Sequence, residues 1–156
     1  MKRDKQSGLR GLYAITDTQL SPEQALLQHV EQALLGGASI IQYRDKSTVD
    51  SQRLAEAATL QSLCREHGAL LIINDDVDLA NRVGADGVHL GADDQAPSSA
   101  RRILGEHAII GVSCYNRLDL ARQAAAKGAD YIAFGRFFPS RIKPGAVQAH
   151  PELLTR

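Results

Sequence analysis

The chain has 156 residues, of which 44% are hydrophobic and 23% charged, an ordinary composition for one globular domain with a proper core. Lysine plus arginine and aspartate plus glutamate both total 18, so no global field attracts nucleic acid or a membrane, and any anion site must be local. Aromatic residues make up 4% with no tryptophan, which argues against a base-stacking platform or a carbohydrate cleft.

Strand and helix patterns alternate along the whole chain. Six short apolar segments, without the alternation of a half-exposed sheet, predict parallel strands that are covered on both faces. In chain order they are residues 12–16, 39–43, 69–73, 87–90, 108–112 and 131–135. Residues 1–10 are expected to form an N-terminal extension, and residues 11–156 a single domain.

Helix patterns fill the gaps between these strands. The first helix is expected to begin at Ser21-Pro22, where a capping serine precedes a proline at the first helical position. Its apolar face comprises Leu26, Val30, Ala33 and Leu34 at helical spacing. A later helix is expected to bury the stripe Leu118, Ala121 and Ala125.

The same turn recurs where a helix passes into a strand. Gly37-Ala38-Ser39, Gly84-Ala85-Asp86 and Gly128-Ala129-Asp130 each combine a glycine that stops a helix with a small and a polar residue. Repeated units of this kind are typical of a (β/α)8 barrel or of an open doubly wound sheet. No G-x-G-x-x-G follows the first strand, so we expect an α/β fold of the (β/α)8 TIM-barrel type.

The length of the chain limits how much of such a barrel it can build. A (β/α)8 barrel takes about 250 residues, whereas this chain accommodates about six βα units in its 156 residues. The last two units are therefore expected to be missing, and residues 151–156 to form the first turns of a sixth helix. An open barrel leaves strand edges through which chains can self-associate.

Acidic and basic side chains follow several predicted strands at the point where each strand ends. Asn74-Asp75 follows the third strand, Asp93-Asp94 the fourth, and Gln42-Tyr43-Arg44-Asp45-Lys46 ends the second. The carboxyl ends of parallel strands meet at one rim, where α/β enzymes build their sites. Acids beside cations at that rim predict a divalent metal and an anionic, phosphorylated ligand.

Plainer interpretations of these residues exist. Asp75 or Asp76 can cap the following helix, and Asp76 is the better cap candidate. Arg44 and Lys46 can form a solvated loop. No histidine or acid is expected to be placed beside Ser113 to activate it, so a polar contact is expected rather than a nucleophile. His89, inside a strand, is expected to be a satisfied interior histidine.

Several motifs in order resemble the thiamine-phosphate synthase family. They are Leu12-Tyr13-Ala14-Ile15-Thr16-Asp17, Gln42-Tyr43-Arg44-Asp45-Lys46, Ile73-Asn74-Asp75-Asp76, Asp86-Gly87-Val88-His89-Leu90-Gly91, Ile110-Gly111-Val112-Ser113 and Lys143-Pro144-Gly145. The resemblance implies a (β/α)8 barrel and a Mg²⁺-dependent transferase. The implied reaction joins aminomethylpyrimidine methyl diphosphate to hydroxyethylthiazole phosphate through a pyrimidinylmethyl cation, giving thiamine phosphate and pyrophosphate.

The resemblance also implies a role for each matching residue. Asp75 and Asp94 would bind Mg²⁺, and Ser113 and Lys143 would act in catalysis. The pyrimidine diphosphate site would comprise Gln42, Tyr43, Arg44, Asp45, Lys46, Asn74, Ser113 and Lys143. Ser140, Arg141 and Ile142 would lie at the thiazole phosphate.

Two positions depart from the family pattern, and the expected absence of the last two units, whose loops supply amides to the thiazole phosphate in the family, is a larger departure that keeps other functions open. Ile142 stands where the family has a hydroxyl residue, and Ala92 replaces a usual glutamine. One alternative is a catalytically impaired fragment or anion-binding module. Another is an enzyme like the related thiazole tautomerase, which shares the barrel but handles no diphosphate. Retention of Arg44, Lys46, Asp75 and Asp94 together favours the synthase.

Composition also bears on the compartment. Residues 1–8 lack the apolar core of a signal peptide, and no apolar run reaches membrane-spanning length. Cys64 and Cys114 form no CxxC pair, as is usual for small buried side chains in a reducing compartment. We expect a cytoplasmic protein that binds small phosphorylated substrates and neither nucleic acid nor membranes.

Overall fold

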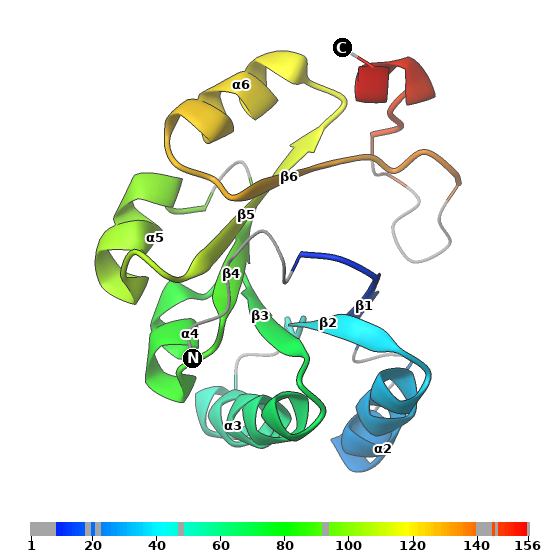
Figure 1. Ribbon diagram of the computed structural model, residues 1–156, viewed down its shortest axis with the longest axis vertical. Helices are drawn as coiled ribbons and strands as arrows, with labels where there is room; N and C mark the ends of the chain where they lie inside the picture. The colour runs from blue at the N-terminus through cyan, green and yellow to red at the C-terminus, as the bar shows by residue number, and fades with distance from the viewer. Residues whose placement is uncertain are drawn as a thin grey trace.

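The computed structural model of the chain describes residues 9–17, 20, 23–46, 49–91, 94–139, 145 and 147–155. Its sheet consists of β1 (Leu12–Ile15), β2 (Ala38–Tyr43), β3 (Leu70–Asn74), β4 (Gly87–Leu90), β5 (Ile109–Tyr115) and β6 (Tyr131–Phe134). The helices are α2 (Glu23–Leu35), α3 (Asp50–Glu66), α4 (Val77–Val83), α5 (Pro97–Leu104), α6 (Leu118–Ala126) and the 3-10 helix η1 (Pro151–Thr155). The helices α2 to α6 lie along the outer side of a curved sheet (Figure 1).

All six predicted strands are confirmed, and their order in the sheet decides the fold type. The strands are parallel and hydrogen-bonded in the order β1-β2-β3-β4-β5-β6, with β1 and β6 as the edges. A doubly wound sheet would reverse its strand order part way and carry helices on both faces. The alternative of an open doubly wound sheet is therefore wrong, and the described residues form an α/β half-barrel.

Alternate strand residues face two different apolar cores. Outward residues such as Ile41, Leu71 and Ile110 pack against the helices, together with Leu60 of α3. Inward residues form a second cluster on the concave side, which consists of Ile40, Leu70, Ile72 and Ile109. Burial on both faces explains why these strands are apolar without alternation.

The recurring turn has a structural reason beyond stopping a helix. Gly84 adopts a left-handed conformation with a φ of 63° at the end of α4. Asp86, two residues later, accepts a 2.8 Å hydrogen bond from the backbone N–H of Leu71 on the neighbouring strand. Asp130 accepts the equivalent 2.8 Å bond from Ile110 N–H and also pairs with Arg101 at 2.7 Å. The acidic residues of the second and third turns thus anchor the adjacent strands.

The helices agree with the predicted patterns with two corrections. Leu26, Val30 and Leu34 of α2 are buried as expected. In α6 the buried residues are Ala121 and Ala124, and the predicted Ala125 is exposed, because the face that packs on β5 lies one position earlier. Residues 151–155, expected as an α-helix, form a 3-10 helix. None of the described helices has the length and apolar character that a membrane crossing requires.

Candidate functional site at the carboxyl ends of the strands

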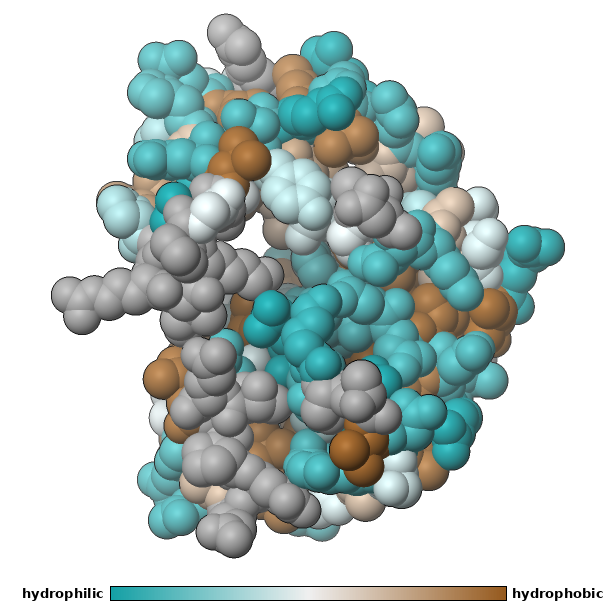
Figure 2. Space-filling model, turned by 180° about the vertical axis from the view of Figure 1, so that it is seen from behind, coloured by the Kyte–Doolittle hydropathy of each residue, from teal (hydrophilic) through white to brown (hydrophobic). Residues whose placement is uncertain are grey.

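A cleft of about 680 Å³ opens on the concave side of the sheet. Residues from all six strands or the loops after them line it, including Gln42, Asn74, His89 and Ser113. The view in Figure 2 shows the molecule hollowed near its middle, with hydrophilic side chains gathered beside the hollow. Below these polar residues lies the apolar cluster around Ile72, so the inside changes from apolar at the amino ends of the strands to polar at their carboxyl ends.

The two predicted metal-binding acids lie next to each other. Asp75 follows β3 in a left-handed backbone conformation with a φ of 64°, and its N–H donates to the carbonyl of His89 at 2.8 Å. Asp94 accepts a 2.6 Å bond from Gly91 N–H. The carboxyl groups of Asp75 and Asp94 are hydrogen-bonded to each other. A left-handed conformation costs an aspartate about 1 kcal/mol or more, and such conformations cluster at functional sites.

Lys46 joins this acid pair from the end of β2. Its Nζ lies 2.7 Å from Asp75 Oδ2. Burial, the largest single influence, raises the pKa of Asp75, but hydrogen bonds from Lys46 and Asp94 and the charge of Lys46 hold it below its ordinary value. Burial and the neighbouring Asp75 raise the pKa of Asp94, although Gly91 N–H opposes the shift. A cation bound between these two carboxylates would relieve their mutual repulsion.

Asp76 takes the helix-capping role, which leaves Asp75 for the site. Asp76 Oδ1 accepts a 2.8 Å bond from Leu79 N–H at the start of α4, as predicted for the better cap candidate. Its Oδ2 pairs with Arg53 of α3 at 2.8 Å. The consecutive acids Asp75 and Asp76 therefore serve different elements.

The remaining residues at the end of β2 divide between the two faces of the sheet. Gln42 and Arg44 line the cleft. Arg44 lies 3.7 Å from Asp17, and its backbone N–H donates to Thr16 Oγ1 at 2.8 Å. These contacts hold the segment after β2 against the end of β1.

The side chain of Tyr43, which was predicted to contact the substrate, points away from the cleft. Its side chain is 2% exposed and belongs to the helix-facing core, and its hydroxyl donates to Glu56 of α3 at 2.6 Å. Asp45 lies on the same side, 3.5 Å from the Tyr43 hydroxyl. Consecutive strand residues point to opposite faces, so Gln42 and Arg44 face the cleft while Tyr43 faces α3.

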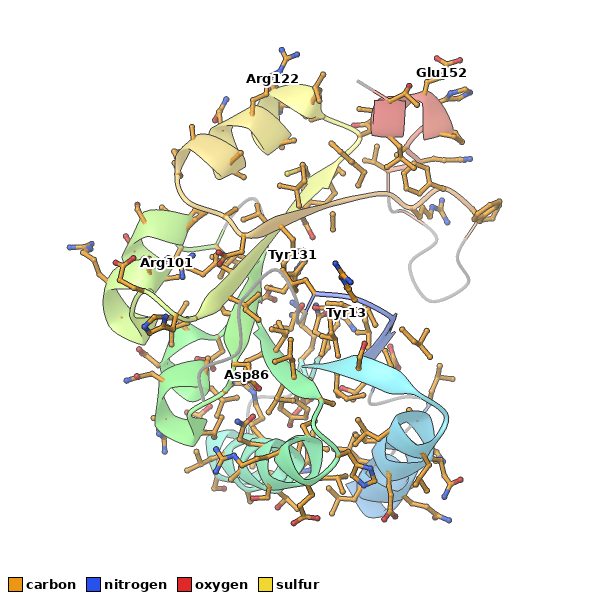
Figure 3. All side chains as sticks on the ribbon, viewed as in Figure 1. Tyr13, Asp86, Arg101, Arg122, Tyr131 and Glu152 are labelled. Carbon is orange, nitrogen blue, oxygen red and sulfur yellow. The ribbon has the colours of Figure 1, made fainter. Side chains whose placement is uncertain are left out.

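A chain of hydrogen-bonded side chains crosses the inside of the half-barrel. Ser113 Oγ lies 2.8 Å from His89 Nε2, and His89 Nδ1 lies 2.9 Å from the Tyr131 hydroxyl. The Tyr131 hydroxyl is 2.9 Å from that of Tyr13, which accepts a 2.8 Å bond from Gln42 Nε2. Figure 3 shows Tyr13 and Tyr131 close together inside the curve of the sheet. This chain joins β5, β4, β6, β1 and β2 in turn.

This series of hydrogen-bonded side chains confirms one prediction and corrects another. Both ring nitrogens of His89 have partners, as expected of a satisfied interior histidine. The expectation that no histidine lies beside Ser113 is wrong, because β4 and β5 pair in parallel and bring His89 against it. Tyr13 and Tyr131 were missed as site residues, although an inward-facing position follows from counting alternate residues along β1 and β6.

Several predicted residues lie outside the part of the chain that the structure describes. These are the predicted helix start at Ser21-Pro22, Ala92 and Asp93 after β4, and Ser140, Arg141, Ile142, Lys143 and Pro144 in the segment after β6. Among the described residues there is no group of three or more histidine, cysteine, aspartate or glutamate side chains arranged to hold a metal. The described oxygen donors that match the predicted metal site are thus the carboxylates of Asp75 and Asp94.

Comparisons with known proteins agree on one family. The family model described as thiamine monophosphate synthase matches residues 12–156. A thiamine-phosphate synthase of Marinobacter nauticus is 57% identical over 145 residues, covering 93% of this chain and 65% of the relative. One of Nitrosococcus oceani is 58% identical over 150 residues, covering 95% and 68%.

A solved structure shares the fold. Thiamine phosphate pyrophosphorylase from Pyrococcus furiosus superposes with a TM-score of 0.78 at 40% identity, covering 87% of this chain and 64% of that one. The chain thus spans slightly less than two thirds of the length of the Marinobacter relative and of this structure. The half-barrel described above corresponds to that share of the larger fold.

Proposed function

The chain belongs to the thiamine monophosphate synthase family, and from this membership we propose that its cleft binds a pyrimidine methyl diphosphate and transfers the pyrimidine to a thiazole phosphate. The products would be thiamine phosphate and pyrophosphate. The observation that carries the proposal is the cluster of Asp75, Asp94 and Lys46. Asp75 follows Asn74, which lines the cleft, and its N–H donates to the carbonyl of His89, which also lines it. An acid pair beside a lysine is suited to a diphosphate that arrives with a divalent cation.

The donor set fits Mg²⁺. This hard cation binds through one or two carboxylates and completes its shell with water and phosphate oxygens. Asp75 and Asp94 are two adjacent oxygen donors, and a cation between them would relieve the repulsion that raises the pKa of Asp94. Bound there, Mg²⁺ would neutralise charge on the departing pyrophosphate.

The side chains around the acid pair would hold the substrate. Lys46 and Arg44 carry fixed positive charges suited to phosphate oxygens, Arg44 with a planar fork and Lys46 as a point charge. Gln42 and Asn74 present amides in the same cleft, where they would contact the pyrimidine. Ser113, 2.8 Å from His89, would donate its hydroxyl to the diphosphate.

The proposed reaction needs little covalent help from these groups. The carbon–oxygen bond to the diphosphate breaks, its electron pair leaves with pyrophosphate, and the thiazole nitrogen attacks the pyrimidinylmethyl cation. Cleft residues contribute by holding both partners in line and by stabilising the negative charge that develops. Lys143, Ser140, Arg141 and Ile142, outside the described residues, retain their expected roles as part of this proposal.

The alternatives differ in what they ask of the acid pair. A thiazole tautomerase handles no diphosphate, so it does not require Lys46 beside two adjacent acids. An anion-binding module without catalysis would bind diphosphate but release no product. The geometry of Asp75, Asp94 and Lys46 supports diphosphate binding by a synthase and by a binding module alike. Turnover is the measurement that distinguishes these two.

Calorimetry with the pyrimidine diphosphate, with and without Mg²⁺, tests the binding half of the proposal. We expect Mg²⁺-dependent binding that Asp75→Asn weakens at least tenfold, about 1.4 kcal/mol. Asp78→Asn, which changes an exposed acid on α4, is the matched control and should bind like the parent. Equal binding by the parent and Asp75→Asn would refute the site. A pyrophosphate-release assay with the thiazole phosphate then measures turnover.

Two further expectations belong to this proposal. Leu12 and Ile15 of the edge strand β1 are each 58% exposed, so we propose that copies of the chain associate through the sheet edges. Light scattering over a concentration series should show a rising mass, which Leu12→Glu suppresses. We also propose a cytoplasmic location, where the free, buried Cys64 and Cys114 would stay reduced.

A further inference from the structure

The proposed function uses only the two ends of the hydrogen-bonded side-chain chain, Gln42 and Ser113. Its three middle members, Tyr13, Tyr131 and His89, have no role there. Yet every link between the five side chains is between 2.8 and 2.9 Å long. Each of the five residues also lines the cleft. A continuous polar path of this kind, which runs beside the apolar cluster around Ile72, requires an explanation.

The central residue, Tyr131, is held in place by its surroundings. Its ring stacks on His89 with centroids 5.6 Å apart and meets Tyr13 edge-on at 6.1 Å. Gly111 on β5 leaves the room it needs, because a Cβ there would lie 2.0 Å from the ring carbon Cζ. The ring also packs against the buried cluster of Ile40, Leu70, Ile72 and Ile109. Burial raises the pKa of Tyr131, so the hydroxyl stays protonated and can donate.

The chemistry of the links gives the chain a direction. A tyrosine hydroxyl carries one proton, and so does a neutral imidazole. Gln42 Nε2 donates to the Tyr13 oxygen. Either tyrosine can be the donor in the link between them, and the direction of the link to His89 depends on its tautomer. The arrangement that uses every proton has Tyr13 donating to Tyr131 and Tyr131 donating to His89 Nδ1. His89 then carries its proton on Nε2, which donates to Ser113 Oγ. The hydroxyl proton of Ser113 is left for an acceptor in the cleft.

We propose that Tyr13, Tyr131 and His89 are positioning residues that fix Ser113 as a hydrogen-bond donor toward an anionic ligand. The identity of that ligand as a diphosphate rests on the proposed function. Diphosphate oxygens only accept hydrogen bonds. A serine that accepts from His89 can donate its own proton to them, whereas a serine that donates to His89 would present only lone pairs to them. The orientation of the Gln42 amide is thereby coupled to the hydrogen-bond direction of Ser113 through three side chains on β1, β6 and β4.

The ¹⁵N resonances of the His89 ring test this directly in the full chain. We expect the Nε2–H tautomer in the parent, with the other four histidines as internal references. Tyr131→Phe, which keeps the ring but removes both hydroxyl links, should give a mixture of tautomers. Tyr13→Phe should also shift the mixture, although Tyr13 does not touch His89. Tyr43→Phe, which removes a buried hydroxyl on the helix-facing side, should leave the His89 resonances unchanged.

Binding of inorganic pyrophosphate with Mg²⁺ gives the second measurement. Tyr131→Phe should weaken this binding roughly five- to tenfold, the worth of about one hydrogen bond. Ser113→Ala should weaken it similarly, and adding Tyr131→Phe to Ser113→Ala should have little further effect, because both changes remove the same donor. Urea unfolding of each variant shows that the fold is retained.

Each outcome decides between the two proposals. The positioning role is overturned if His89 of the parent is in the Nδ1–H tautomer, or if neither tyrosine variant changes its tautomer ratio. Either result leaves the proposed function intact. The expected tautomer pattern without any pyrophosphate binding by the parent overturns the proposed function but leaves the direction of the chain standing. Fully additive losses from Tyr131→Phe and Ser113→Ala also overturn the positioning role.

Discussion

Substitution of Gly111 by alanine tests the packing on which the site depends. A Cβ at this position would lie 2.0 Å from Tyr131 Cζ and 2.3 Å from its hydroxyl oxygen. Tyr131 must therefore move, which breaks its hydrogen bonds to Tyr13 and His89. Overpacking costs about 1–3 kcal/mol, and each lost hydrogen bond about 1 kcal/mol. Alanine also restricts the unfolded chain more than glycine does, which raises the free energy of unfolding by about 0.5–1 kcal/mol.

The expected loss is thus about 2–4 kcal/mol in the free energy of unfolding, measured by urea denaturation at neutral pH. For a domain of this size the midpoint of thermal unfolding should fall by about 5–15 °C. Gly145→Ala is the control, because a Cβ there would meet nothing within 4 Å. In a Tyr131→Ala background the effect of Gly111→Ala should largely disappear. A loss below about 0.5 kcal/mol in the parent background would refute the argument.

Further predictions concern ion pairs. Arg101→Met should lower the free energy of unfolding, measured in urea, by about 2 kcal/mol, because Arg101 and Asp130 are largely buried and Asp130 anchors β5. Arg102→Met, on the exposed face of the same helix, should change it little. The lowered pKa of Asp75 means that its pairing with Lys46 stabilises the fold above pH about 4 and is lost as pH falls through the folded pKa. Lys46→Met should lower the free energy of unfolding by under about 1 kcal/mol at neutral pH, because Lys46 is exposed. This difference from the parent should disappear in acid. A difference that grew as the pH fell would contradict the assignment.

The strands could be predicted because their burial leaves a direct mark on the sequence. Parallel strands covered on both faces are continuous apolar runs, and the six segments stand out between glycine-containing turns. Helix phase was harder to predict, as Ala125 shows, because alanine-rich segments give several equivalent apolar faces. Asp75 and Asp94 could be predicted because strand ends converge at one rim.

The contacts inside the half-barrel could not be read in the same way. Which residue lies beside Ser113 depends on the register of β4 against β5, and no local pattern encodes that register. Tyr43 was assigned to the substrate as a member of the motif Gln42-Tyr43-Arg44-Asp45-Lys46, yet side chains alternate within one strand. The polar path through Tyr13 and Tyr131 joins residues 118 positions apart, so it follows only from the curvature of the whole sheet.

The placement of the tyrosines has a spectroscopic consequence. The chain has four tyrosines and no tryptophan, and Tyr13, Tyr115 and Tyr131 line the cleft. Its intrinsic ultraviolet fluorescence therefore originates mainly from the walls of the cavity, with no brighter chromophore to mask it. Ligand entry can be followed by optical titration of the unlabelled protein, and Tyr43 on the opposite side of the sheet provides the constant background.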